Sequence, residues 1–233
     1  MMSKNMNLFS EALDTAFIKP ISVLGIPNTG KNYISIDLSE TNEKLIDVDV
    51  SSSEKFSQYI ETYLRDHNSD VAYGGYLESR NIYKRSTHFN QQNSDTERNI
   101  HLGVDLWCPK GTKVLAALDG EIHSFRNNTN YGDYGPTIIL KHVVQKMDFY
   151  ALYGHLSLES IEGLKEGDKI KQGECIGYLG ASQVNGDYPP HLHFQIIKDL
   201  QGFIGDYPGV CSKADLEFYK TNCPDPNILL KLF

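Results

Sequence analysis

The chain has 233 residues, of which 40% are hydrophobic, so it can build one large domain or one domain with a small N-terminal addition. Its formal net charge of -8 argues against a nucleic-acid partner, because phosphate backbones attract positive surfaces. No stretch is as long and apolar as a membrane span, and residues 1–8 lack the apolar core of a secretion signal. We therefore expect a cytoplasmic protein with no membrane partner, whose four cysteines are reduced thiols.

Residues 1–72 are expected to form a small N-terminal α/β region. Residues 8–20 predict a short helix. Residues 33–38 alternate between apolar and polar side chains as a strand does, and residues 45–50 are expected to pair with them. Residues 54–67 carry apolar side chains at helical spacing, after serines that can cap a helix. We predict a β-β-α addition without a catalytic pattern.

Residues 73–98 are predicted to form a linker. It is either an ordered connector whose aromatic side chains pack on the domain surface or one wall of a substrate cleft. The linker places Arg80 after a Gly-Gly-Tyr sequence, and glycine lets a backbone approach a ligand closely. Because arginine can bind a carboxylate through two parallel hydrogen bonds, Arg80 and Tyr83 are candidate substrate-binding residues. The alternative is that Arg80 pairs with Glu78 or Asp70 at the surface, where an ion pair contributes only about 0–1 kcal/mol.

Residues 99–233 are predicted to form a mostly antiparallel β domain, with an irregular C-terminal tail from residue 206. Turn sequences separate short apolar runs, and little of this segment has helical spacing. Asp119-Gly120 is typical of a hairpin turn between two strands, and the next two apolar runs are expected to pair. Together with the N-terminal helices, this predicts a mainly β chain of the α+β class. The clearest strands are expected at residues 113–118, 121–125, 137–142 and 148–155.

Two side chains of metal-ligand type, His101 and Asp105, lie four residues apart at the start of this domain. On a helix they would be neighbours, whereas on a flat strand they would lie roughly 13 Å apart, too far to share one ion. Gly103 lies between them, disfavours a regular helix and permits a bend. We therefore predict a turn that brings the imidazole and the carboxylate to one point.

Three further histidines occur in apolar runs of the same domain. His191 and His193 alternate with Leu192 and Phe194, so a strand places both imidazoles on one face, roughly 7 Å apart. His155 ends another apolar run. A single histidine is more often a structural residue, but three separate patterns favour a common site. A catalytic zinc ion has three protein ligands and an open position for water, and the remaining histidines suit proton transfer. Spacing alone does not decide which of His191 and His193 binds the metal.

These candidates occur in three motifs that resemble, in the same order, those of the lysostaphin-type (LytM-like) zinc metallopeptidases. The resemblance covers roughly residues 98–198. It implies an antiparallel β metallopeptidase domain with a groove that holds one Zn²⁺ ion per chain. It also implies that His101, Asp105 and His193 are the zinc ligands and that His155 and His191 are catalytic. The motifs are His101-Leu-Gly-Val-Asp105, Leu152-Tyr-Gly-His155-Leu156 and His191-Leu-His193-Phe194.

The leading hypothesis is a zinc-dependent metalloendopeptidase or amide hydrolase of the peptidoglycan-hydrolase type, in which metal-activated water attacks a peptide carbonyl. Its substrate would be a peptide or a small amide. The alternative is a cytoplasmic metal-binding or small-molecule-processing domain without peptidase activity. The flanks at residues 74–80, 206–210 and 223–227 resemble a subgroup that is joined to a kinase-like part and a class III aminotransferase. That resemblance implies a functional link to an aminotransferase or kinase protein.

Two residues close to the motifs carry further expectations. Cys108 lies three residues beyond Asp105, and a thiolate there could bind zinc. The preferred interpretation is a buried, inert thiol, because free cysteine is usually buried. For Arg80, we predict that its loop folds over the β domain near the groove and directs the guanidinium to the metal side.

Overall fold

The structure is a computed structural model that describes residues 2–85 and 95–232. Part of the predicted linker, residues 86–94, therefore lies outside the described residues. The strands are β1 (Tyr33–Ser35), β2 (Val71–Gly74), β3 (Arg98–His101), β4 (Val104–Trp107), β5 (Lys113–Leu115), β6 (Gly120–Asn128), β7 (Gly135–Val144), β8 (Met147–Gly154), β9 (Lys169–Ile170), β10 (Cys175–Tyr178), β11 (His191–Ile197) and β12 (Val210–Ser212). The helices are α1 (Met2–Ala16), α2 (Ser53–Asp66), α3 (Leu216–Asn222) and α4 (Asn227–Leu230), with short 3₁₀ helices η1 (Glu43–Leu45), η2 (Asn81–Arg85) and η3 (Leu158–Ile161).

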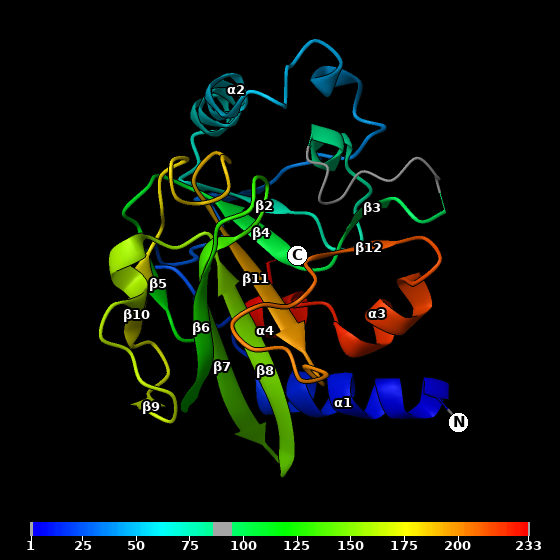
Figure 1. Ribbon diagram of the computed structural model, residues 1–233, viewed down its shortest axis with the longest axis vertical. Coiled ribbons are helices and arrows are strands. Elements are labelled where there is room, and N and C mark those ends of the chain that lie inside the picture. The colour runs from blue at the N-terminus through cyan, green and yellow to red at the C-terminus, as the bar shows by residue number, and fades with distance from the viewer. Residues whose placement is uncertain (1, 86–94, 233) are drawn as a thin grey trace.

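The largest sheet has eight strands in the order β1-β2-β4-β11-β8-β7-β6-β9 (Figure 1). Its neighbours are antiparallel, except that β1 and β2 are parallel. Two smaller antiparallel sheets pair β10 with β5 and β12 with β3. The prediction of a mainly β, mostly antiparallel fold is confirmed. None of the helices in the described residues is long and apolar enough to span a membrane.

The central strands are buried on both faces because apolar side chains alternate between two clusters. Ile138 and Leu140 of β7 belong to the main core, whereas Ile139 between them belongs to a second cluster. On β11, Leu192 and Phe194 enter the main core, as the sequence predicted. The opposite face of β11 is thereby left for its histidines.

Two helices from the N-terminal region cover different ends of the sheet (Figure 1). Phe9 of α1 packs edge-on against Phe149 of β8, with ring centroids 5.5 Å apart. Phe56 of α2 packs against Trp107 of β4 at 5.4 Å. Helix α2 matches the predicted helix closely. Helix α1 runs from Met2 to Ala16, so it both begins and ends earlier than the predicted residues 8–20.

The predicted β-β-α unit is wrong in one strand. Residues 45–50 form turns after η1 instead of a strand, and β1 pairs in parallel with β2. The second edge of β2 pairs with β4, so the main sheet runs across the predicted boundary between residues 72 and 73. The division of the chain into residues 1–72, 73–98 and 99–233 stays a prediction.

Two further expectations for the C-terminal part are corrected. Strand β5 pairs with β10 instead of forming a hairpin with β6. The Asp119 carboxylate accepts a hydrogen bond from the backbone of Gln172, so this turn binds a distant loop. The tail from residue 206 is not irregular: it contains β12, α3 and α4, because β12 finds a partner in β3.

Candidate metal centre

Asp105 and His193 lie side by side because β4 and β11 pair in a register that sets them directly opposite each other. In antiparallel pairs, opposed residues project to the same face of the sheet. The row continues to Gly74 of β2 on one side and Gly154 of β8 on the other. Since glycine has no side chain, this row of the sheet presents only the carboxylate and the imidazole.

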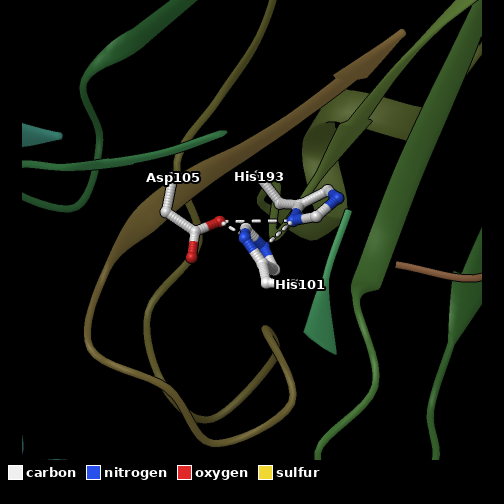
Figure 2. Close-up of side chains that lie close together, drawn as sticks. All are labelled: His101, Asp105 and His193. Carbon is white, nitrogen blue, oxygen red and sulfur yellow. Dashed lines mark hydrogen bonds and ion pairs between the residues drawn. The ribbon is translucent and has the colours of Figure 1, made fainter. Parts of the chain in front are cut away.

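His101 reaches the same point from the end of β3. Its Nε2 atom lies 3.2 Å from Asp105 Oδ1 and 2.8 Å from His193 Nδ1 (Figure 2). The predicted turn between His101 and Asp105 is therefore present. Glycine at position 103 lets the backbone pass close to the His193 ring, because a Cβ atom there would lie 2.7 Å from His193 Cε1.

The three donor atoms form a triangle of the right size for one zinc ion. Its edges are 2.8, 3.2 and 3.2 Å. Tetrahedral zinc with bonds of about 2.0–2.1 Å holds its ligand atoms roughly 3.3 Å apart. Among the described residues this is the one cluster of His, Cys, Asp and Glu side chains that could hold a metal. Two imidazoles and one carboxylate thus fit a single zinc, with a fourth position left open.

Each ligand histidine has its second ring nitrogen occupied. His101 Nδ1 donates a hydrogen bond to the carbonyl oxygen of Gly75 at 2.9 Å. His193 Nε2 donates to Gln195 Oε1 at 2.9 Å. These partners fix the tautomer and leave the other nitrogen of each ring as the electron-pair donor to a metal. Gln195 lies two residues after His193 on the same strand face, so strand alternation could have identified it.

Arg80 holds the second oxygen of Asp105. Its Nη1 donates to Asp105 Oδ2 at 2.5 Å, and its Nε donates to Glu78 Oε2 at 2.5 Å. The side chain is buried, so the surface alternative for Arg80 is wrong even though the Glu78 pair exists. The guanidinium lies on the metal side, as expected. Its contacts are with the protein's own carboxylates, and its role in substrate binding stays a prediction.

The buried site favours the protonation states that bind metal. Burial lowers the pKa of His101 and of His191 to about 4 and that of His155 well below its usual value. Burial by itself would raise the pKa of Asp105, but His101 and Arg80 hold it well below the usual range. At neutral pH these histidines are neutral and the carboxylate is ionised, which are the forms that ligate zinc.

The two remaining histidines, His155 and His191, face the ligand triangle. Each donates from Nδ1 to a backbone carbonyl at 2.8 Å, that of Asn185 for His155 and that of Pro189 for His191. A carbonyl can only accept, so Nδ1 carries the proton and Nε2 is free to accept one. His191 Nε2 lies 3.8 Å from Asp105 Oδ1. The ring centroids of His155 and His191 are 4.2 Å apart.

His155 is held in a strained backbone conformation. Its φ angle is +63°, in the left-handed region that side chains other than glycine rarely adopt. The backbone amide donates to Tyr134 and the carbonyl accepts from Gly180, both at 2.9 Å. Such strain persists only where surrounding contacts determine the conformation, and it concentrates at functional sites.

Two aromatic residues at the site were not predicted from the sequence. Trp107 stacks on His191, with ring centroids 3.9 Å apart. It lies two residues after Asp105 on β4, so strand alternation could have placed it there. Tyr134 brings its hydroxyl to 3.4 Å from His193 Nε2. It comes from a polar loop whose sequence has no pattern that would indicate this contact.

The residues of the ligand triangle line one cavity of about 340 Å³, together with Arg80, Trp107 and Tyr134. Tyr83 also lines it, and its ring stacks on His101 at 6.5 Å between centroids. The structure thus brings both predicted substrate-binding residues to the cavity wall, while their function stays a prediction. The cavity lining thus includes Arg80, Tyr83 and the five residues of the proposed site. Those five are His101, Asp105 and His193 of the ligand triangle and the two further histidines, His155 and His191.

A buried triangle of two imidazoles and a carboxylate, with further imidazoles beside it, is the donor set of a catalytic zinc centre. The model of Peptidase family M23 matches residues 99–203, which contain all five metal-site and histidine positions. The M23 family is therefore supported for this segment, which is somewhat less than half of the chain.

Curated relatives share this segment. Peptidoglycan DD-endopeptidase ShyC of Vibrio cholerae is 33% identical over 98 residues, which are 42% of this chain and 20% of that protein. Cell division protein DipM of Caulobacter vibrioides is 33% identical over 94 residues, or 40% of this chain and 14% of that protein. The chain thus spans a fifth or less of the length of these relatives.

Solved structures overlap with about half of the chain. The catalytic domain of lysostaphin from Staphylococcus simulans has a TM-score of 0.36 and 27% identity, covering 52% of this chain and 80% of that one. A zinc-containing peptidase from Vibrio cholerae has a TM-score of 0.35 and 25% identity, covering 53% and 36%.

Removal of a ligand should abolish zinc binding. We expect the wild-type chain to bind one zinc and Asp105→Ala or His193→Ala to bind none, as measured by elemental analysis after gel filtration. Cys108→Ser is the matched control, since this thiol is buried with a pKa raised to about 12 by burial and lies outside the ligand cluster. Full occupancy in both ligand variants, or a loss of about tenfold or more in affinity for Cys108→Ser, would refute the assignment.

The close packing at Gly103 gives a second prediction. Gly103→Ala should weaken zinc binding about tenfold or more, because the added methyl group displaces the His193 ring. Zinc affinity is measured by competition with a chelator. Gly111→Ala serves as a control for backbone strain alone, because Gly111 has a φ of +78° but a Cβ atom there meets no atom within 4 Å. Equal affinities in the two variants would show that the approach at Gly103 does not position the ligand.

Arg80→Lys separates two roles of Arg80. Lysine keeps the charge but lacks the planar fork that spans Glu78 and Asp105. If Arg80 positions Asp105, zinc affinity falls roughly 10–100-fold, as is usual for partners of metal ligands. If zinc affinity is unchanged and only KM rises, Arg80 binds substrate directly instead.

Proposed function

We propose that this chain is a zinc-dependent peptidase or amide hydrolase. In the proposal His101, Asp105 and His193 bind zinc, and His155 and His191 are catalytic. The observation that carries it is the pair of neutral histidines beside the ligand triangle. A structural zinc site is closed by four protein ligands and has no use for two further acceptor nitrogens.

When bound, zinc supplies a Lewis acid that polarises a carbonyl and makes water more acidic. The chain's own residues supply proton transfer and orientation. His155 and His191 each present an unprotonated Nε2 to the cavity, so either can take a proton from water and return it to the leaving amine. Once protonated, the imidazolium can donate a hydrogen bond to an oxyanion beside it.

Both histidine rings are held in place by neighbouring residues. Trp107 stacks flat on His191, and the Asn185 carbonyl holds His155 in its strained turn. Both rings therefore keep their Nε2 atoms aimed at the cavity without reorganisation during the reaction. Groups fixed in advance in this way contribute most to stabilising a transition state.

The substrate is proposed to be a peptide or a small amide. ShyC is named as a peptidoglycan endopeptidase, and the match to it supports amide hydrolysis by this chain. We also propose a cytoplasmic location, in keeping with four free cysteines among the described residues. The flanks that resemble aminotransferase-linked proteins support a functional link to an aminotransferase or kinase protein.

The test is to separate zinc binding from turnover. His191→Ala should keep one zinc per chain yet lose about 10²–10⁴-fold in kcat/KM, the usual contribution of a general acid–base group. Amine release from dipeptides and glycine-rich peptides is measured beside zinc content. His123→Ala is the matched control, because this histidine lies on β6 beside Tyr150 and is not part of the cavity wall.

Two outcomes would contradict the proposal. Loss of zinc in His191→Ala would mean that the roles of His191 and His193 are exchanged. A zinc-loaded wild-type chain that releases no amine from any substrate would favour the metal-binding alternative without peptidase activity.

A further inference from the structure

The side chains of the proposed catalytic site line one cavity, which is partly open to solvent. The five metal-site and histidine residues are between 1% and 5% exposed. A peptidase that cuts within a long chain needs the substrate to enter and leave on both sides of the scissile bond. An extended chain advances roughly 3.3 Å per residue, so each further residue needs its own length of open groove. The room inside the cavity, about 340 Å³, therefore limits what can reach the metal.

One wall of the cavity comes from the N-terminal region, which lies outside the M23-matched segment. We call residues 38–50 with Phe56 the N-terminal wall. Five of the wall residues that line the cavity are apolar, and Ser39, Glu40 and Asn42 are polar or charged. Its apolar members that line the cavity are Leu38, Leu45, Ile46, Val50 and Phe56.

The N-terminal wall is tied to the rest of the site. The amide of Leu38 donates to Glu78 Oε1 at 3.0 Å, and the amide of Glu40 donates to the Ser79 carbonyl at 2.8 Å. Because Glu78 also accepts from Arg80, the wall is connected through one ion-pair chain to the ligand Asp105.

The α2 end of the wall is fixed as well. Ser53 Oγ donates to Asp187 Oδ1 at 2.6 Å. Arg85, at the end of η2, lies over the Tyr188 ring at 4.2 Å and within 3.6 Å of Asp187 Oδ2. Phe56 itself packs on Trp107, which stacks on His191. These contacts make the wall part of the packed structure.

A second part of the cavity wall, residues 206–210, also lies beyond the matched segment. The amide of Leu102 donates to the Gly209 carbonyl at 2.8 Å, and Arg98 Nε donates to the Val210 carbonyl at 3.2 Å. The pairing of β12 with β3 continues this connection. Both walls are thus additions that this chain makes around the matched segment.

We infer that the substrate is a small free amide of about dipeptide size with at least one apolar side chain, and not a cross-linked polymer strand. The inference rests on the proposed function, since it concerns the same site. The cavity of about 340 Å³ is at the small end of the range of small-molecule sites, roughly 300–1,000 Å³. The apolar side chains of the N-terminal wall would contact the apolar side chain of the substrate. The amide carbonyl of the substrate would lie at the ligand triangle.

The test uses two probes that do not require the natural substrate. The first is a leucine-containing phosphinic dipeptide analogue, in which a tetrahedral phosphinate replaces the amide. The second is the same analogue extended by two residues at each end. Binding to the zinc-loaded full chain is measured by calorimetry. We expect the dipeptide analogue to bind about tenfold or more tightly than the extended one, because the walls exclude the added residues.

A variant tests the wall itself. Leu45→Trp fills the cavity from the N-terminal wall and should weaken the dipeptide analogue about tenfold or more at unchanged zinc content. Val143→Trp is the control, because it adds the same side chain at an exposed position on β7, outside the cavity wall.

The possible failures are distinguishable. Equal or tighter binding of the extended analogue, cleavage of purified peptidoglycan by the zinc-loaded chain, or unchanged affinity in Leu45→Trp would overturn the size limit and leave the proposed function standing. If neither analogue binds the zinc-loaded chain, the proposed function itself fails.

Discussion

The register between β4 and β11 is the constraint on which the site depends. It sets Asp105 directly opposite His193 and, two residues along, Trp107 opposite His191. A slip of one residue would turn one member of each pair to the other face of the sheet. Burial of Leu192 and Phe194 in the main core prevents this slip, since each fully buried side chain of this kind contributes roughly 1.5–3 kcal/mol. One face of β11 thus packs into the main core, and its other face contributes histidines to the metal centre.

The outer contacts of the site come from segments that are far apart in the sequence. Gly75 and Arg80, from the segment before the M23-matched region, contact His101 and Asp105. Buried charges are costly unless they are paired, so the chain of Glu78, Arg80 and Asp105 couples the N-terminal region to the metal centre. The N-terminal region therefore contacts the metal centre through this chain of residues, and β1 and β2 also extend the main sheet.

The sequence predicts what depends on local pattern. Alternation placed the β11 histidines on one face, and Gly103 indicated the turn that brings His101 to Asp105. The pairing of β5 with β10 was missed, because the local turn sequence favours a hairpin and the true partner lies some 60 residues away. Tyr134 was missed for the same reason, since its contact with His193 is set by tertiary packing of a loop. Non-local pairing of this kind leaves no period in the sequence.

The most direct measurement of the central claim is a crystal structure of the zinc-loaded chain, with anomalous scattering recorded on both sides of the zinc edge. We predict one strong peak, bonded to His101 Nε2, Asp105 Oδ1 and His193 Nδ1, with its fourth position open to the cavity beside His155 and His191. A peak elsewhere, or one in which His191 Nε2 replaces His193 Nδ1 as a ligand, would contradict it.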